Sequence, residues 1–211
     1  MKSLPIGPPG DQVRNVFHTI GSERLGIIFP GWSYTSEMPL LYYSGRILRE
    51  AGFDLLQVDY DYPQRGFDLT DDNEGEIFAR LKREVYAAVD TVLEGRNYRE
   101  IVLIGKSLGT RAMLHALERI GGRIKTNCVW LTPVIGDDAF FEQLKSVHVH
   151  SIAIIGTDDP HFNESKLKQL NAEVLVLEGA DHALERPGNL QCSVSELEKV
   201  TGFIRTFVGE K

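Results

Sequence analysis

The feature of this sequence that most constrains its fold is an alternation of short apolar runs with segments whose apolar residues recur at helical spacing. The apolar runs are expected to be strands, and they cover residues 24–29, 53–60, 100–104, 128–131, 151–155 and 173–177. Strands that are apolar along their length, each followed by a helix, are typical of a parallel sheet with both faces covered. The alternation therefore predicts an α/β protein, a three-layer α/β/α sandwich with a mostly parallel sheet.

The segments between these runs are expected to be helices. They cover residues 39–51, 108–120, 138–144 and 164–170, with a long helix before residue 100 and a last one near the C-terminus. Asp71 or Asp72 can cap the long helix, and Ser193 with Glu196 matches a capping box for the last one. Residues 13–21 alternate more, which favours an antiparallel edge strand or a hairpin. No linker or repeat divides the chain, so we expect one domain over residues 1–211.

Composition and charge argue against several classes of protein. The chain has 42% apolar and 25% charged residues, which is the composition of a folded protein, and its two cysteines do not form a disulfide scaffold. No apolar run approaches the roughly 18 residues of a membrane span, and the first twelve residues lack the apolar segment of a secretory signal. A net charge of −7 argues against a nucleic-acid partner. We therefore expect a cytoplasmic protein that binds neither membranes nor nucleic acid; the oligomeric state is not predicted.

A G-x-S-x-G motif follows one of the predicted strands. It consists of Gly105, Lys106, Ser107, Leu108 and Gly109, and it lies between an apolar strand and the start of a helix. A serine on a sharp strand-to-helix turn takes a strained backbone, and crowding around it favours glycine two residues to either side. The motif in this context predicts that Ser107 is a nucleophile. Lys106 is expected to be solvated or in a salt bridge.

A serine nucleophile needs a base within hydrogen-bond reach and an acid that orients the base. Candidates follow the next strands in the order acid, then histidine: Asp158 and Asp159 after one strand, and His182 after another. The carboxyl ends of parallel strands meet at one edge of a sheet, so these side chains can converge with Ser107. Asp159 is favoured over Asp158 as the acid, and both stay open. His161 can line the mouth of such a site.

These motifs, in this order, resemble those of the α/β-hydrolases, from about residue 25 to residue 207. The resemblance implies a catalytic triad of Ser107, Asp159 and His182, with an oxyanion hole formed by the main-chain amides of Trp32 and Leu108. The family often has a histidine before the glycine of the oxyanion loop, whereas this chain has Phe29 and Pro30 there. The hydrogen bond with which that histidine can brace the loop is therefore absent.

Fewer than 20 residues separate the predicted strands at 128–131 and 151–155, which leaves no room for a cap domain. The site is then open, and aromatic loop residues such as Tyr34 and Phe162 are candidates for binding an apolar group. The resemblance implies a serine hydrolase that cleaves a small-molecule ester or thioester through an acyl-enzyme, with no metal and no organic cofactor. The alternative is a catalytically silent binding or scaffold protein with the same fold. A metal site at His148 and His150 is disfavoured, because no cysteine accompanies the pair.

Overall fold

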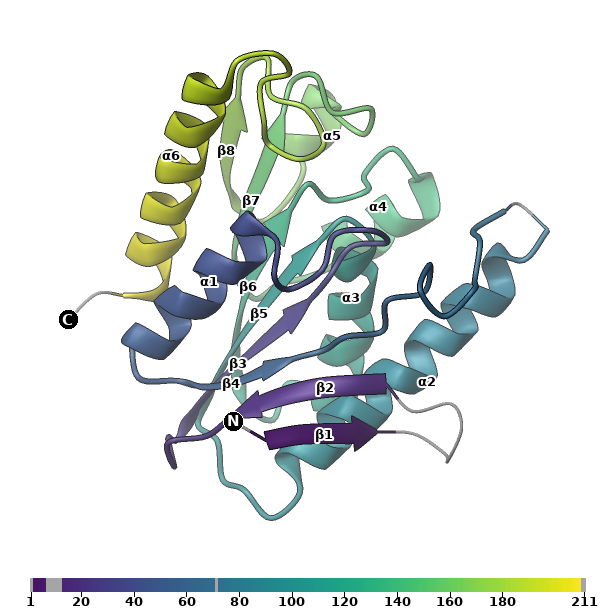
Figure 1. The fold of residues 1–211 in the computed structure, drawn as a ribbon, viewed down its shortest axis with the longest axis vertical. Helices are drawn as coiled ribbons and strands as arrows, with labels where there is room; N and C mark the ends of the chain where they lie inside the picture. The colour runs from purple at the N-terminus through teal and green to yellow at the C-terminus, as the bar shows by residue number, and fades with distance from the viewer. Residues whose placement is uncertain (1, 7–12, 71, 210–211) are drawn as a thin grey trace.

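The computed structural model describes residues 2–6, 13–70 and 72–209, and it forms one twisted sheet with helices on both faces (Figure 1). The strands are β1 (Lys2–Ile6), β2 (Val13–His18), β3 (Arg24–Phe29), β4 (Asp54–Gln57), β5 (Glu100–Lys106), β6 (Lys125–Leu131), β7 (His150–Gly156) and β8 (Glu173–Leu177). Their order in the sheet is β1-β2-β4-β3-β5-β6-β7-β8. The pairs β1–β2 and β2–β4 are antiparallel and all other pairs are parallel, which confirms the mostly parallel sheet. The region predicted as an antiparallel edge strand or a hairpin forms the single antiparallel strand β2, but β1 lies outside it in the sheet, so β2 is neither the edge strand nor a hairpin by itself.

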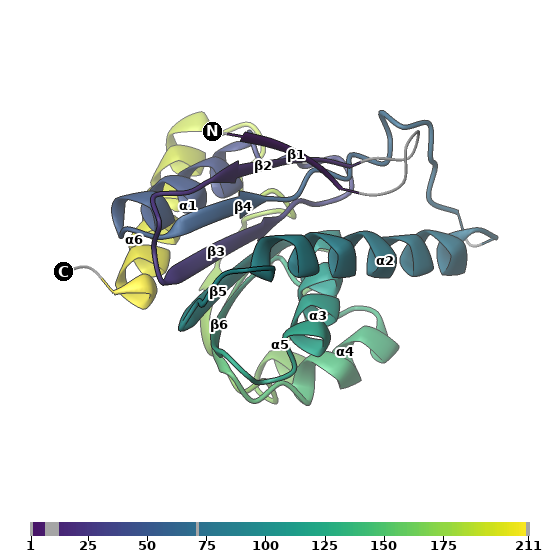
Figure 2. The same cartoon turned by 90° about the horizontal axis from the view of Figure 1, so that it is seen from below.

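Helices cover the sheet in two layers, which Figure 2 shows edge-on. The helices are α1 (Pro39–Glu50), α2 (Glu74–Leu93), α3 (Leu108–Ile120), α4 (Asp138–Lys145), α5 (Glu164–Leu167) and α6 (Leu190–Val208). α1 and α6 pack on one face, and α2, α3, α4 and α5 lie on the other (Figures 1 and 2). The predicted three-layer sandwich is therefore confirmed.

Two apolar cores hold the layers together, one on each face of the sheet. Alternate residues of a strand point to opposite faces, so Leu25 and Ile27 pack towards α2 and α3 while Ile28 packs towards α1 and α6. In β6, Trp130 and Val129 divide between the two cores in the same way. Because both faces are covered, the central strands are apolar throughout, which is the pattern that the sequence carries.

The last helix begins earlier than its predicted capping box. Asn189 is the N-cap, and its side chain accepts a hydrogen bond from the Cys192 amide at 3.0 Å. The Ser193 hydroxyl instead accepts from the Arg186 amide at 2.9 Å, and the buried Glu196 pairs with Arg186 and Lys199. The capping-box prediction was wrong because asparagine is as good an N-cap as serine and lies one turn earlier.

Several other predicted boundaries differ from the structure. α5 ends at Leu167 rather than at residue 170, and β6 begins at Lys125 rather than at Cys128. β4 ends at Gln57, so the predicted strand over 53–60 is too long at its C-terminal end. α2 begins at Glu74 with Asn73 in the N-cap position, which excludes Asp72 as the cap, and Asp71 lies outside the described residues. The Asn73 side chain accepts from the Thr70 amide at 2.9 Å and so stabilises the preceding turn rather than the helix.

The connection from β6 to β7 contains α4 and short loops, so no cap domain covers the carboxyl edge of the sheet there, as predicted. Within the described part of the chain, no helix combines the length and the apolar character needed to cross a membrane.

Candidate active site

The residues predicted for the site follow strands that lie side by side in the sheet. Trp32 follows β3, Ser107 follows β5, Asp159 follows β7 and His182 follows β8. These strands are parallel and belong to the continuous order β3-β5-β6-β7-β8. The fold therefore gathers their loops at one edge, where α/β proteins carry their functional groups.

Ser107 lies on a strained turn between β5 and α3. Its backbone has φ 52° and ψ −115°, which residues other than glycine rarely adopt. A side chain at Gly109 would place a Cβ 2.8 Å from the Pro30 carbonyl oxygen, and one at Gly105 would place a Cβ 2.6 Å from the Met113 sulfur. Both flanking glycines are thus required by close packing, as the motif predicts.

Asp159 and His182 form a hydrogen-bonded pair. His182 Nδ1 lies 2.7 Å from Asp159 Oδ2, and the Asp159 side chain is fully buried. The second carboxylate oxygen accepts from the His161 amide at 2.8 Å. With Nδ1–H donating to the carboxylate, the imidazole keeps Nε2 as an acceptor, which is the tautomer that a general base needs.

Asp158 has a different position. It is exposed, its carboxylate accepts from the Thr157 hydroxyl at 3.3 Å, and its amide donates to the Ala180 carbonyl at 3.0 Å. Of the two candidate acids, the structure therefore brings Asp159 to the imidazole.

The Ser107 hydroxyl lies at the same edge without a bond to the histidine. Ser107 is half-buried, and across residues 2–6, 13–70 and 72–209 no hydrogen bond joins it to His182. Catalytic hydrogen bonds are often long in structures without substrate and tighten in the complex. The structure thus provides an acid–base pair, Asp159 and His182, and a serine on a strained turn, with no hydrogen bond between the serine and the histidine.

The loop after β3 lies directly against the serine. A Cβ on Gly31 would lie 3.6 Å from the Cβ of Ser107, and the Gly31 amide donates to the Tyr34 carbonyl at 2.9 Å. The next amide is that of Trp32, and Leu108 begins α3 on the other side of the serine. Amides in the first turn of a helix lack partners within that helix and can serve an anion.

The two predicted substrate-binding residues lie on different sides of the sheet. The Tyr34 hydroxyl accepts from the Leu40 amide at 3.0 Å, and burial raises the pKa of Tyr34 to about 12. Phe162 is half-buried and packs against the core beneath α3 and α4.

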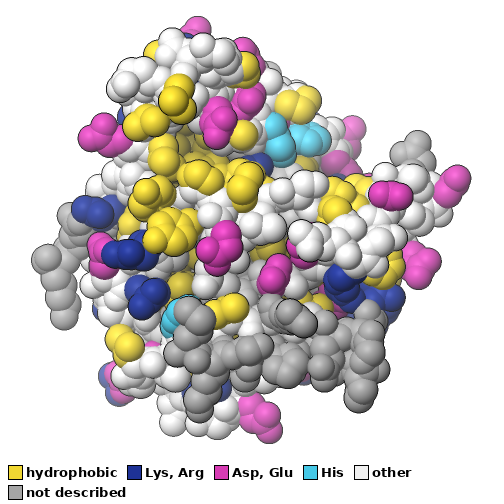
Figure 3. All heavy atoms as spheres, in the orientation of Figure 1, with side chains coloured by type: hydrophobic (Ala, Val, Ile, Leu, Met, Phe, Trp, Pro, Cys, Tyr) yellow, Lys and Arg dark blue, Asp and Glu magenta, His cyan; other side chains and the backbone are white. Residues whose placement is uncertain are grey.

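Tyr34 also lines a pocket of about 160 Å³ between the loop after β3, the loop after β8 and the start of α6. Its lining is Tyr34, Pro39, Leu40, Ala183, Leu184, Glu185, Leu190, Ser193, Val194 and Leu197. Figure 3 shows hydrophobic side chains gathered between the upper ends of α1 and α6, beside histidine surface.

Lys106 is buried rather than solvated, and no ion pair of its ammonium occurs within residues 2–6, 13–70 and 72–209, so the prediction of a solvated or salt-bridged lysine was wrong. It is 2% exposed, and its ammonium lies 4.6 Å from the centre of the Tyr34 ring. Burial lowers the pKa of Lys106 to about 8, while the carboxylates of Asp159 and Asp181 favour its charged form. The sequence signal was its place at the end of β5, directly after an apolar run whose residues are all buried from Ile101 onwards.

His161 contacts the histidine of the pair. Its ring lies 5.5 Å from that of His182, edge to face, and burial lowers its pKa. His150, by contrast, is the first residue of β7, at the opposite end of that strand from Asp159, and it stacks on Phe207 at 4.6 Å. Among the described residues, no three histidine, cysteine or acidic side chains form a cluster that could hold a metal ion.

Backbone strain concentrates in the loops at the same edge. The non-glycine residues with positive φ in the described chain are Asp61, Ser107, Thr132 and Leu184, which follow β4, β5, β6 and β8. Strained residues persist where the surroundings hold them, and they cluster at active sites. This strain supports the carboxyl edge of the sheet as the functional one.

Comparison with solved structures gives several neighbours with the same fold. Est1E from Butyrivibrio proteoclasticus, solved with ferulic acid bound, superposes with a TM-score of 0.72 at 16% identity, and the match covers 97% of each chain. Dienelactone hydrolase from Anabaena variabilis gives a TM-score of 0.69 at 19% identity, covering 98% of this chain and 95% of its own.

A third neighbour is XC6422 from Xanthomonas campestris, described as a serine hydrolase without a lid, with a TM-score of 0.69 at 14% identity over 98% of this chain and 93% of its own. No family model and no curated protein sequence matches the chain. The architecture and these neighbours together show that the chain has the fold of the lid-less α/β-hydrolases.

Proposed function

We propose that this protein is a serine hydrolase that cleaves a small carboxylic ester or thioester through an acyl-enzyme on Ser107. The observation that carries the proposal is a serine on a strained elbow at the edge where a buried carboxylate orients an imidazole, with 2.7 Å between Asp159 Oδ2 and His182 Nδ1. The likeness to hydrolases at 14–19% identity supports the fold, and the activity is inferred from the site.

In the proposed reaction, the Ser107 hydroxyl attacks the carbonyl carbon while His182 Nε2 takes its proton. The negative charge on the carbonyl oxygen is stabilised by the amides of Trp32 and Leu108. The tetrahedral intermediate then expels the alcohol or thiol, which receives the proton from His182. Water repeats the sequence on the acyl-enzyme and releases the acid, and Asp159 stabilises the imidazolium in both halves.

The pocket lined by Tyr34 and Leu184 is suited to the leaving group. His182 protonates the leaving atom, so that group lies beside the imidazole, and Ala183 and Leu184 of the pocket follow His182 in the chain. Cavities of about 150 Å³ accommodate a benzene ring. The pocket, at about 160 Å³, therefore fits an aryl or short branched leaving group.

Hydrolysis of p-nitrophenyl esters of increasing acyl length tests the proposal, with a feruloyl ester added because one structural neighbour binds ferulic acid. The wild type is expected to show a burst of p-nitrophenol equal to the enzyme concentration or a steady rate above background. Ser107→Ala is expected to lower kcat at least about 10³-fold. Ser165→Ala, at an exposed serine of α5, is the matched control and should leave the rate unchanged.

The same experiment separates the catalytic proposal from a silent binding protein. One observation favours a binding protein without catalytic activity: within the described part of the chain, no hydrogen bond joins Ser107 to His182. A wild-type rate at background across the whole series, or an equal rate in Ser107→Ala, would support it and reject the hydrolase.

A further inference from the structure

The oxyanion loop lacks the histidine with which α/β-hydrolases often brace it, and another residue contacts the loop in its place. We infer that Tyr60 is a positioning residue that holds the oxyanion loop through the carbonyl of Pro30. The inference rests on the proposed function, because it assigns Tyr60 a part in stabilising the oxyanion of that reaction.

One peptide unit of the loop is fixed at both of its ends. The Tyr60 hydroxyl donates to the Pro30 carbonyl oxygen at 2.5 Å. The N–H of the same peptide, that of Gly31, donates to the Tyr34 carbonyl at 2.9 Å. This peptide immediately precedes the one that carries the Trp32 amide, so its orientation determines where that amide points.

Tyr60 is itself held by an aromatic stack. It is fully buried, and its ring lies 5.2 Å from that of Tyr62 with 15° between the planes. The Tyr62 hydroxyl donates to Glu84 at 2.7 Å, and the Tyr62 ring lies 5.6 Å from that of Trp32. Tyr60 therefore fixes the main chain of the loop, while Tyr62 contacts the side chain of the residue that supplies the amide.

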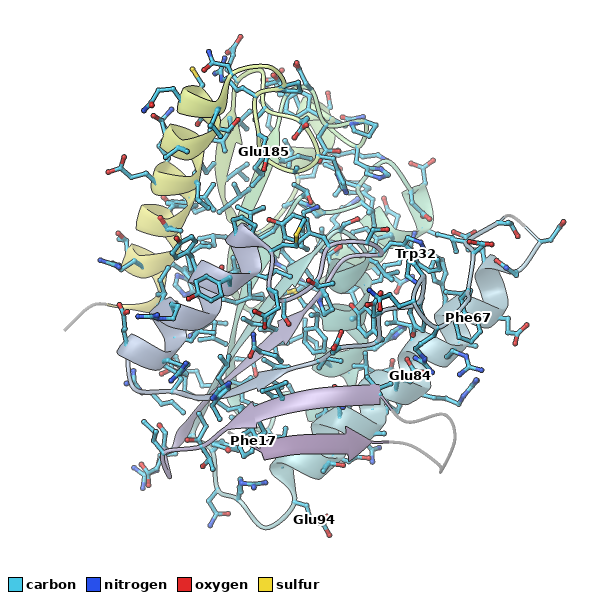
Figure 4. All side chains as sticks on the ribbon, viewed as in Figure 1. Phe17, Trp32, Phe67, Glu84, Glu94 and Glu185 are labelled. Atoms are coloured by element: carbon cyan, nitrogen blue, oxygen red, sulfur yellow. The ribbon has the colours of Figure 1, made fainter. Side chains whose placement is uncertain are left out.

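An ion pair between Arg65 and Glu84 of α2 contacts both tyrosines of this stack. Arg65 donates to Glu84 at 2.9 Å and to the Tyr60 carbonyl at 3.2 Å. In Figure 4, Trp32 and Phe67 lie on the same side of the molecule as Glu84, which belongs to α2. Burial raises the pKa of Tyr60 well above its ordinary value, so its hydroxyl stays a donor over the whole working range of pH.

Removing the hydroxyl should disturb catalysis through the position of the Trp32 amide. An oxyanion-hole donor contributes about 10²–10³-fold to kcat, and a displacement of about 1 Å can cost 10²-fold. Tyr60→Phe keeps the ring, the stack and the burial but leaves the Pro30 carbonyl without its donor. We expect kcat for an oxygen ester to fall about ten-fold or more, with KM little changed.

A thionoester makes the test specific to the oxyanion. Sulfur in place of the carbonyl oxygen accepts hydrogen bonds poorly, so a weakened oxyanion hole costs less with this substrate. Tyr60→Phe should therefore lose at least about three-fold more kcat/KM on the oxygen ester than on the thionoester. Equal losses on both substrates, or no loss, would overturn the inference.

Tyr98→Phe is the matched control. Tyr98 is also a buried tyrosine, and its hydroxyl donates to Asp54 at 2.9 Å, away from the oxyanion loop. It should lower the thermal unfolding midpoint without changing kcat or the ratio of ester to thionoester rates.

Amide hydrogen exchange gives a second readout that does not need activity. Tyr60→Phe should accelerate exchange of the Gly31 amide about ten-fold or more, while amides of the central strands keep their wild-type rates. Unchanged exchange at Gly31 would overturn the inference even if the protein hydrolyses no ester. A wild type that is active through Ser107, with Tyr60→Phe equally active, would reject the role of Tyr60 and leave the proposed function standing.

Discussion

Gly109→Ala tests whether close contact between the elbow and the oxyanion loop sets the active geometry. A Cβ at residue 109 would lie 2.8 Å from both the Phe29 carbonyl carbon and the Pro30 oxygen, and closer still to the Phe29 oxygen. An ordinary contact begins near 3.4 Å, so the two atoms at 2.8 Å alone require about 0.6 Å of separation between α3 and the loop, and the closer Phe29 oxygen requires more. The clashing atoms are all backbone, so no side-chain rotation can relieve them.

This separation moves the amides of Trp32 and Leu108 away from each other. Over-packing of this kind costs roughly 1–3 kcal/mol of stability. Because displacement of about 1 Å can cost 10²-fold in rate, we expect kcat/KM on p-nitrophenyl acetate to fall about 10–100-fold at temperatures where the variant is fully folded.

Gly202→Ala in α6 is the matched control, because a Cβ there meets no atom within 4 Å. Alanine is a better helix former than glycine, so this variant should gain about 0.5–1 kcal/mol and keep its activity. Stopped-flow or plate-reader rates with thermal unfolding measured on the same samples decide the outcome. Wild-type kcat/KM in Gly109→Ala would refute the reasoning.

Three further predictions concern the acid, the buried lysine and the pocket. Asp159→Asn should lower kcat by roughly 10³–10⁴-fold while Asp158→Asn stays near the wild type, measured by ester hydrolysis; the reverse pattern would exchange their roles. Burial lowers the pKa of Lys106 from 10.5 to about 8. Between these two pH values the unfolded chain therefore binds more protons than the folded one, so the free energy of unfolding should rise with pH. The rise should amount to roughly 2–4 kcal/mol in urea titrations at pH 7 and pH 10, and Lys106→Met should lack it; an equal rise in this variant counts against the buried lysine. Val194→Trp should fill the pocket at the start of α6 and lower kcat/KM about ten-fold for a p-nitrophenyl ester, but not for the methyl ester of the same acid. Equal effects on both esters would mean that the leaving group binds elsewhere.

The layers of the fold could be predicted because each central strand is covered on both faces. Such strands are apolar at every position, as in Ile101 to Ile104, and the helices between them carry a single apolar stripe. The place of β4 between β2 and β3 was not predicted, because strand order depends on tertiary packing that no local pattern records. Helix starts were less predictable still: Asn189 and Ser193 are both good caps, and their surroundings decide between them.

In the candidate site, too, the features that depend on local sequence could be predicted, and those that depend on contacts between distant residues could not. Ser107 and its two glycines could be predicted because the backbone of the elbow admits little else. The choice between Asp158 and Asp159 required coordinates, since adjacent residues point in different directions. The hydrogen bond from Tyr60 to Pro30 could not be predicted, because it joins residues thirty positions apart beyond the ends of two neighbouring strands. The burial of Lys106 was missed because a charged residue next to a nucleophile suggests the surface.

Labelling with a fluorophosphonate, followed by mass spectrometry of the tryptic peptides, tests the central claim that Ser107 is a nucleophile activated by His182. The account predicts one adduct per chain on the Ser107 hydroxyl, with labelling abolished in Ser107→Ala and strongly slowed in His182→Ala. An adduct on a different residue, or a labelling rate that does not change in either variant, would contradict it.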